Sequence, residues 1–455
     1  MTPFDIHKLL IYTQVKKCSI TSFMNYKQAV KRVFLRSFFL LLTGFFFLLP
    51  LSLVSADERR AGENLTIKIA LIGPGTELYF WWGHIGLLIE DHARGTSTFY
   101  DYGIFSFDNE NFFTNFAMGR LIYSSGASEA ERNYYIYRVT NRDIILYTLD
   151  LAPEIRERVR LFAEENVLPE NRDYFYHHFK DNCSTRIRDI IDFALEGQFK
   201  EAFGTAPGRF TFREHIRRHM WFAPVEDWYL NFLMGRDIDK PITIWEEMFL
   251  PSEVAKRITD FTYIDPQGVE RTLVSNVETL NQSINRPAVL DAPPETWHHS
   301  LFLGLIISAI LMLFTLLKKK TSVPLGISHS LLGIFWGLSG TLLFFMSFFT
   351  DHDYTYNNIN VVFVNPLLLA AIPLGFMSVS KNIKKRLFAE KLLKFLWTYV
   401  FFSCIIAMVI NRFPGFLQQN QATEALVIPF SLLLSSVLLL AFRMVSKKKN
   451  RKRFH

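Results

Sequence analysis

Five apolar runs beyond Trp297 constrain this chain most, because each is close to the length needed to cross a bilayer of about 30 Å. They lie at about 300–317, 325–349, 361–380, 395–411 and 425–442. Basic residues follow the first, third and fifth runs, at 318–320, 381–386 and 447–453. Cytoplasmic flanks of membrane helices carry such an excess of lysine and arginine. The sequence therefore predicts five transmembrane helices over 298–446, with loops 350–360 and 412–424 outside and a basic tail at 447–455 in the cytoplasm.

An apolar stretch from Ser37 to Val54 follows four basic residues near the start of the chain, and small residues end it at Ala56. This pattern is typical of a secretory signal peptide, so we expect a leader over 1–56, with Met24 as an alternative start. An uncleaved anchor helix is the other interpretation, and it leaves the next region on the same side. Either way, residues 57–297 are expected outside the cytoplasm.

The positive charge of the chain is concentrated in the segments that flank the predicted membrane helices. The net charge is +7 over 455 residues, but the basic clusters stand beside the apolar runs. That placement argues against nucleic acid as a partner and favours membrane lipids.

The exported region reads as an α+β domain over 57–264. Residues 66–72, 83–90, 97–101 and 134–139 have strand character, and 91–95 has the composition of a hairpin turn. Residues 153–167 read as an amphipathic helix, and a second helix begins after Asp181 or Asn182 and ends near Gly197. The polar stretch 265–297 is expected to be a tether to the first membrane helix.

Cys183 is the one cysteine of the exported region, since Cys18 lies in the leader and Cys404 lies in an apolar run. One sulfur forms no internal disulfide and is too few for a cysteine metal site. It is therefore either an inert packed thiol or a nucleophile. In the first turn of its predicted helix, the helix dipole and unpaired N–H groups favour the thiolate.

A nucleophilic thiol needs a histidine nearby, oriented by a third group. His84 at the start of a strand is the best candidate, with Asp101 on the returning strand to orient it; both also fit a purely structural role. His177 and His178 precede the cysteine by six and five residues, and one of them is expected to help bind substrate or to serve as the alternative base. The spacing of these histidines matches no standard zinc signature, and there is no phosphate-binding loop. We expect no metal and no cofactor.

A histidine-bearing strand upstream of an Asn-Cys helix start resembles the circularly permuted papain-like arrangement of enzymes similar to lecithin retinol acyltransferase and NlpC-type peptidases. More specifically, the chain resembles the Lnb family of bacterial lipoprotein N-acyltransferases. The matching segments are Gly73-Pro74-Gly75 with Glu77, Gly83-His84, Tyr100-Asp101-Tyr102-Gly103, Asp181-Asn182-Cys183-Ser184-Thr185-Arg186, Gly235-Arg236 with Pro241, and Trp245-Glu246-Glu247-Met248-Phe249-Leu250-Pro251. They cover most of residues 66–255. A run from Asp351 to Asn360, followed by Asn365-Pro366, is similar to an outer loop of that family.

The resemblance implies a papain-like periplasmic domain followed by the membrane helices, in a bacterial inner membrane. Cys183 is then the nucleophile and His84 its base, whereas Asp101 as third member is our own inference. The implied activity moves an acyl chain from a phospholipid or lipoprotein donor, through a thioester, to a lipoprotein N-terminus. Substrate binding is expected at His178, Asn182, Arg186, His352, Asn358, Asn360 and Asn365. For the last four, a solvent-exposed loop in which asparagines cap helices is an equally good explanation.

Three other functions remain open at the level of sequence. A cell-wall thiol peptidase or amidase and a phospholipase would use the same cysteine and histidine. A membrane sensor or assembly factor would use neither. Five spans exceed what a peptidase of soluble wall fragments needs as an anchor, and this favours a substrate confined to lipid.

Overall fold

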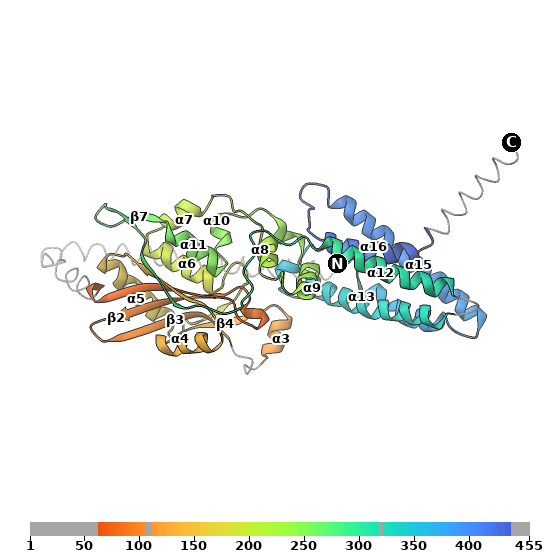
Figure 1. Cartoon of the computed structure of the whole chain (residues 1–455), viewed down its shortest axis with the longest axis horizontal. Helices are drawn as coiled ribbons and strands as arrows, with labels where there is room; N and C mark the ends of the chain where they lie inside the picture. Colours follow the sequence, from red (N-terminus) through yellow and green to blue (C-terminus); the bar gives the residue numbers. More distant parts are fainter. Residues whose placement is uncertain (1–61, 106–110, 318–321, 438–455) are drawn as a thin grey trace, which may run out of the picture. The chain divides into compact units, whose positions relative to one another are not determined.

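An antiparallel sheet, seven-stranded within the described residues, organises the N-terminal part of the protein (Figure 1). The computed structural model describes residues 62–105, 111–317 and 322–437. The strands run in the order β6-β4-β3-β2-β1-β5-β9. Their bounds are β1 Leu65–Ile72, β2 His84–Asp91, β3 Thr96–Ile104, β4 Ile122–Glu129, β5 Ile144–Leu149, β6 Asp173–Phe175 and β9 Val274–Asn281. The strands predicted over 66–72, 83–90 and 97–101 are confirmed, and the leader predicted over 1–56 lies outside the described residues.

Strands β2 and β3 form the predicted hairpin, and its register sets the geometry of the site. Leu87 pairs with Tyr100 and Asp91 with Thr96. Continued to the open end of the hairpin, the same register places His84 opposite Gly103. Side chains alternate between faces along a strand, so Asp101, two residues before Gly103, shares its face of the sheet.

Helices cover both faces of this sheet. Helix α6 (Cys183–Ala194) packs through Ile187 and Ile191 into the core that contains Ile85 and Leu87. Helix α5 (Pro153–Asn166) confirms the helix that was predicted over 153–167. It joins the same core. A separate core on the other face joins Leu88 and Phe99 to helix α4 (Ala130–Val139).

Helix α4 replaces a predicted strand. Residues 134–139 are rich in tyrosine, isoleucine and valine, which favour strands. However, the buried residues are Ala130, Tyr134 and Tyr137, spaced by four and three positions. That spacing places them on one helical face, so packing overrides the strand propensity of the individual residues. The strand prediction was wrong.

The stretch predicted as a tether, 265–297, contains further sheet. Strand β8 (Glu270–Thr272) pairs with β7 (Thr262–Ile264), which lies just before this stretch, and β9 adds to the edge of the main sheet beside β5. Most residues of β9 are exposed. An exposed edge strand needs no apolar alternation, which explains why its polar composition concealed it.

Five short helices lie between α6 and β7, namely α7 Gln198–Phe203, α8 Phe212–Arg218, α9 Pro224–Leu233, α10 Ile244–Glu247 and α11 Pro251–Thr259. Arg213 of α8 is fully buried and pairs with Asp239 at 2.7 Å. It also donates to the carbonyls of Met234 and Gly235. A buried arginine with this many acceptors fixes the chain where α9 ends.

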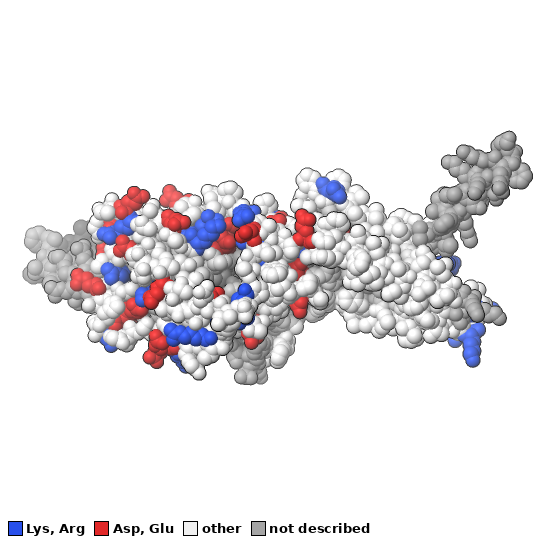
Figure 2. Space-filling model, in the orientation of Figure 1, with Lys and Arg blue, Asp and Glu red and all other residues white. Residues whose placement is uncertain are grey.

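The C-terminal part consists of long apolar helices. Four stretches of the described residues are long and apolar enough to cross a membrane: α12 Trp297–Leu316, α13 Val323–Phe349, residues Ile359–Met377 and α15 Ile383–Ile410. The fifth predicted span corresponds to the shorter α16 (Gln421–Leu434), and residues 438–442 lie outside the described part. Figure 2 shows charged side chains spread over the sheet-bearing part and almost none over α12 and α13.

The third apolar stretch is a broken helix. It consists of the 3₁₀ turns Ile359–Val362 and Pro366–Ala370, followed by α14 (Ala371–Met377). At the break, Asn365 donates to Val361 O at 3.1 Å and to Tyr399 Oη at 2.8 Å, while Tyr399 donates to Val362 O at 2.6 Å. These bonds satisfy carbonyls that a continuous helix would have used itself.

Buried amides join the two parts of the protein where α9 ends. Asn358 Nδ2 donates to the carbonyls of Phe232 and Leu233, and Asn360 Nδ2 donates to that of Phe232. From the other outer loop, Gln418 Nε2 donates to Met234 O and to Asn358 Oδ1. The loops that follow α13 and α15 are therefore bonded directly to the sheet-bearing part.

Candidate active site

Cys183 is the first residue of helix α6, as the sequence predicted, and Asn182 caps that helix. Asn182 Oδ1 accepts from the backbone N–H groups of Ser184 and Thr185, each at 2.9 Å. Thr185 Oγ1 in turn accepts from Asn182 N, which completes a capping box. The cap fixes the thiol at the positive end of the helix dipole, where a thiolate is stabilised.

His84 is positioned by the glycine before it. Gly83 has φ +80°, a conformation that L residues rarely adopt, and it turns the chain into β2 at His84. The side chain of His84 is 14% exposed, so the imidazole is largely shielded but still reachable.

Asp101 and His84 form a close ion pair, with Asp101 Oδ1 2.9 Å from His84 Nε2. Neither atom has an aligned hydrogen-bond partner, so the contact works mainly through charge. Gly103 shows that the three side chains converge. A Cβ placed there would lie 3.6 Å from His84 Cε1, 3.7 Å from Cys183 Cβ and 3.9 Å from Asp101 Oδ1. The residues that the sequence singled out as nucleophile, base and orienting group thus surround one glycine.

The charges in this group favour a thiolate beside an imidazolium. Burial alone would raise the pKa of Cys183, but the charge of His84 and a hydrogen bond to it outweigh burial and lower that pKa. Burial also opposes the charged form of His84, but the negative charges of Asp101 and Cys183 raise the pKa of His84 well above 6.5. Opposite charges at short range stabilise each other in this way.

Several neighbours of the thiol were missed from the sequence. Ser184 Oγ lies 3.9 Å from Cys183 Sγ. Tyr174 Oη is buried without a hydrogen-bond partner, and burial followed by the charge of Cys183 raises its pKa, so the hydroxyl stays protonated. Arg142, 2% exposed, lies over the ring of Tyr137, whose pKa responds to His84. Aromatic residues such as Tyr174 and Tyr137 are normally interpreted as core. Their place beside the thiol therefore leaves no signal in the sequence.

The predicted substrate-binding residues near the thiol have internal partners. Asn182 Nδ2 donates to the carbonyls of His178 and Phe249 at 2.7 and 3.0 Å. Arg186 forms a two-bond pair with Asp181 and covers the ring of Tyr174. Burial, and then the charges of His177 and His352, lower the pKa of His178 to about 4, so its ring is neutral at pH 7. Their binding of substrate stays a prediction.

The other four predicted substrate-binding residues, His352, Asn358, Asn360 and Asn365, belong to the membrane part. Asn358, Asn360 and Asn365 use their amides in the junction and at the helix break described above. His352 also bonds to the sheet-bearing part: its Nε2 lies 3.0 Å from Phe116 O, whereas its Nδ1 lies 2.7 Å from Tyr354 Oη of its own loop. Head-group binding by these four residues stays a prediction, and the structure gives each a bonding role within the protein.

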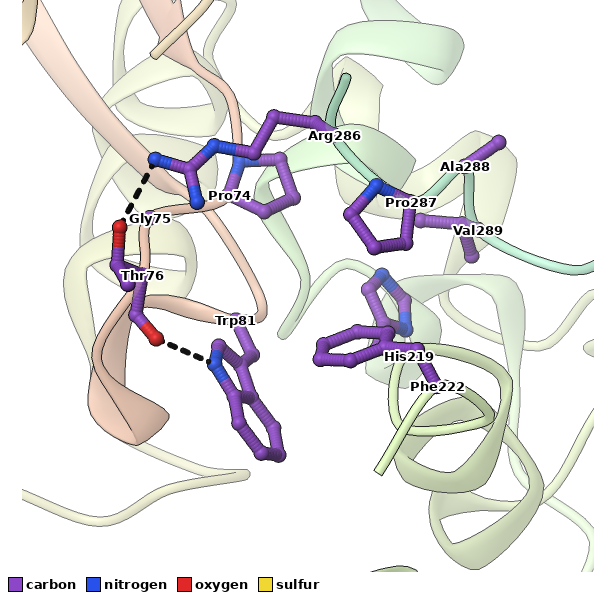
Figure 3. A pocket seen from close by; sticks show the side chains of 10 residues that line it. All are labelled: Pro74, Gly75, Thr76, Trp81, His219, Phe222, Arg286, Pro287, Ala288 and Val289. Atoms are coloured by element: carbon purple, nitrogen blue, oxygen red, sulfur yellow. Dashed lines mark hydrogen bonds between the residues drawn. The ribbon is translucent and has the colours of Figure 1, made fainter. Parts of the chain in front are cut away.

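A cavity of about 160 Å³ opens beside the Gly73–Gly75 loop (Figure 3). Trp81 and Phe222 line it, with ring centroids 4.9 Å apart. Arg286 at its rim donates to Thr76 Oγ1, and Trp81 donates to Thr76 O, as the dashed lines show. Cys183, His84 and Asp101 are not among its lining residues. The cavity is therefore separate from the thiol site.

Both parts of the chain match known domain families. Residues 55–218 match the family described as Lnb N-terminal periplasmic domain, and residues 296–449 match the family described as Lnb transmembrane domain. No curated protein and no solved structure shows a significant match. The two matched segments occur in the order of the sheet-bearing and helical parts described above. Together the two matches support an Lnb-type family for this chain, as a membrane protein with a periplasmic domain.

Proposed function

We propose that this protein is a thiol-dependent acyltransferase that moves a fatty acyl chain to the N-terminal amine of the lipidated cysteine of a lipoprotein. One observation supports this most: Cys183, His84 and Asp101 converge in a periplasmic domain that is bonded to the outer loops of a membrane part. The acyl donor is a phospholipid or a lipoprotein, and both substrates are confined to lipid. A nucleophile at a helix start, facing a histidine on an antiparallel sheet, also supports a permuted papain-like fold.

In the first half-reaction, the Cys183 thiolate attacks the carbonyl carbon of an acyl ester. The carbon–sulfur bond forms, the ester carbon–oxygen bond breaks, and the imidazolium of His84 gives its proton to the departing alkoxide. Asp101 holds the imidazolium in place by its charge. Asn182 Oδ1 occupies the N–H groups of Ser184 and Thr185. We therefore assign the oxyanion to the N–H of Cys183, with Tyr174 Oη as a further donor.

In the second half-reaction, the amine attacks the thioester. The carbon–nitrogen bond forms, the carbon–sulfur bond breaks, and neutral His84 takes the proton that the amine loses. The thiolate beside an imidazolium is thereby restored. If water replaces the amine, the same steps hydrolyse the donor, which would be the phospholipase alternative.

The decisive experiment traps acylated Cys183 on the full-length protein in nanodiscs and weighs the adduct. We expect the mass of a fatty acyl chain on the peptide that contains Cys183, and none in Cys183→Ser. Mass spectrometry of lipoprotein N-termini then separates the alternatives. Free amines that appear on deletion support acyl transfer, whereas unchanged N-termini contradict it. A phenotype that survives Cys183→Ser would favour the sensor or assembly factor instead.

A further inference from the structure

A closed circuit of aromatic contacts connects the thiol site to the outer surface of the membrane part. Its first arm lies in the periplasmic domain and runs from Phe105 to Tyr123, then Tyr176, then His178. The successive ring centroids are 5.2, 4.1 and 5.4 Å apart. Such distances are typical of aromatic pairs in direct contact.

The second arm returns through the loop at 350–360, which follows α13. His178 contacts Tyr354 at 5.5 Å, and Tyr354 contacts His352 at 5.4 Å. His352 contacts Phe116 at 6.4 Å on helix α3 (Phe112–Ala117). Phe112 then closes the circuit, with centroids 6.0 Å from Phe116 and 6.4 Å from Phe105. We refer to these eight rings, four in each arm, as the aromatic circuit.

The first arm adjoins the nucleophile. Tyr123 is paired in register with Tyr174, whose ring is covered by Arg186 from the first turn of α6. Burial, followed by the charge of Cys183, raises the pKa of Tyr123 to about 12. Tyr176 stacks on Tyr123 and begins the turn that ends at Cys183. A chain that follows these rings therefore arrives beside the first turn of α6, which carries Cys183.

The second arm lies beside the end of a candidate membrane span. Helix α13, one of the candidate spans, ends at Phe349, and the next residues bond to α3: Asp351 N donates to Met118 O at 2.8 Å. Phe113 and Phe116 of α3 are 73% and 50% exposed. Large apolar side chains at the end of a membrane helix are covered by lipid rather than by water. Helix α3 thus places two exposed phenylalanines next to the end of a candidate membrane span.

We propose that α3 and the aromatic circuit form the acyl-chain binding surface, along which the chain of a membrane lipid passes from the outer leaflet to Cys183. The occupant is an acyl chain because this surface is apolar, begins at the lipid boundary and ends at the nucleophile. His178 and His352 then contribute neutral rings rather than charges. This inference rests on the proposed acyl transfer and adds the route of the donor to it.

Photo-crosslinking tests the lipid contact without any need for activity. A benzophenone amino acid replaces Phe113 in the full-length protein, in nanodiscs of phosphatidylglycerol and phosphatidylethanolamine. Tyr135 on α4, 66% exposed, gives a matched control position. We expect lipid adducts at position 113 and none at 135. Equal labelling at both positions, or no lipid at 113, would overturn the inference.

A second measurement follows acylation. With Phe113→Ser and Phe116→Ser combined, acyl-Cys183 formation from phospholipid should fall about tenfold, or ~1.4 kcal/mol of binding. Tyr135→Ser should leave it unchanged. Alkylation of Cys183 by iodoacetamide, which needs no lipid, should be equal in all three proteins and so reports an intact site.

The two hypotheses fail in different ways. If the protein with benzophenone at position 113 crosslinks lipid but wild-type protein never carries an acyl group on Cys183, the proposed function fails and the acyl-chain binding surface is kept. If wild-type protein is acylated and the variant with Phe113→Ser and Phe116→Ser is acylated as fast, the proposed acyl-chain binding surface is refuted and the proposed function is kept.

Discussion

His177 Nε2 lies 2.9 Å from Asp353 Oδ1, so the turn that precedes the nucleophile is held by the outer loop between α13 and the broken third stretch. Lys180 of the same turn donates to Asp353 Oδ2 at 2.5 Å. The hydrogen bond from His177 and the charge of Lys180 lower the pKa of Asp353 in spite of its burial. A residue of the membrane part therefore orients the segment that carries Asn182 and Cys183.

Asp353→Asn should slow acylation of Cys183 by its effect on this turn. We expect the rate of thiol alkylation to fall and its pH midpoint to shift, because the turn no longer fixes the helix start. Asp351→Asn is the matched control, since Asp351 belongs to the same loop and pairs with Arg120 in an exposed contact. Equal effects of the two substitutions on the pH profile would contradict a positioning role for Asp353.

The pH dependence of alkylation should reveal the ion pair at the site. Because the pKa of Cys183 is lowered and that of His84 is raised, wild-type protein should react with iodoacetamide at neutral pH and lose reactivity as pH falls through the lowered thiol pKa. His84→Ala should move the midpoint up toward about 8.5, the ordinary thiol value. Acyl transfer should fall about 10²- to 10⁴-fold with it. Identical profiles for the two proteins would exclude His84 as the partner of the thiol.

Asp101→Asn separates the orienting carboxylate from the base. Removal of its charge should lower the pKa of His84, which Asp101 raises, and should also remove the repulsion that raises the pKa of Cys183. The imidazole should then deprotonate at lower pH, which titration of labelled His84 by NMR in detergent can follow. An unchanged histidine titration would show that Asp101 does not act on His84.

Gly103→Ala should fold normally and react poorly. The added Cβ would meet its nearest neighbours at 3.6 to 3.9 Å, which are ordinary contact distances, so the free protein accommodates it. However, it fills space next to Cys183 Cβ and the imidazole of His84, and small displacements of reacting groups cost up to about 10²-fold in rate. Thermal unfolding should be unchanged while acylation slows. Full activity would place the reacting carbonyl away from Gly103.

Asn360→Ala tests the junction. Asn360 is fully buried, donates to Phe232 O at 3.0 Å and accepts from Asn420 Nδ2 at 2.9 Å. Loss of these partners leaves buried polar groups unsatisfied, at a cost of about 1–3 kcal/mol. The midpoint of thermal unfolding in detergent should fall, while Cys183 alkylation below that temperature stays normal. Unchanged stability with weakened lipid binding would favour the head-group role that the sequence suggested.

The local elements of the site were predictable from the sequence because their signals are short-range. The capping residue Asn182, the apolar spacing of α6 and the hairpin of β2 and β3 follow from neighbouring residues alone. The convergence of Cys183, His84 and Asp101 was inferred from residue types and is supported by the distances at Gly103.

The remaining features depend on contacts between distant segments. Strand β9 is recognisable only beside β5, and α4 only where Tyr134 and Tyr137 meet Phe99 and its neighbours. Likewise, the asparagines of the outer loop read as polar residues at the lipid boundary. Nothing in the sequence indicates that their partners are the last carbonyls of α9. Long-range pairing of this kind leaves no periodic pattern in the sequence.

The amide bonds where α9 ends also limit how the proposed transfer can proceed. They tie Phe232 and Leu233 to one outer loop and Met234 to another. A domain held at two loops has little freedom to move toward the bilayer. In the proposed reaction, Cys183 therefore keeps its position and the acyl chain has to move to the sulfur.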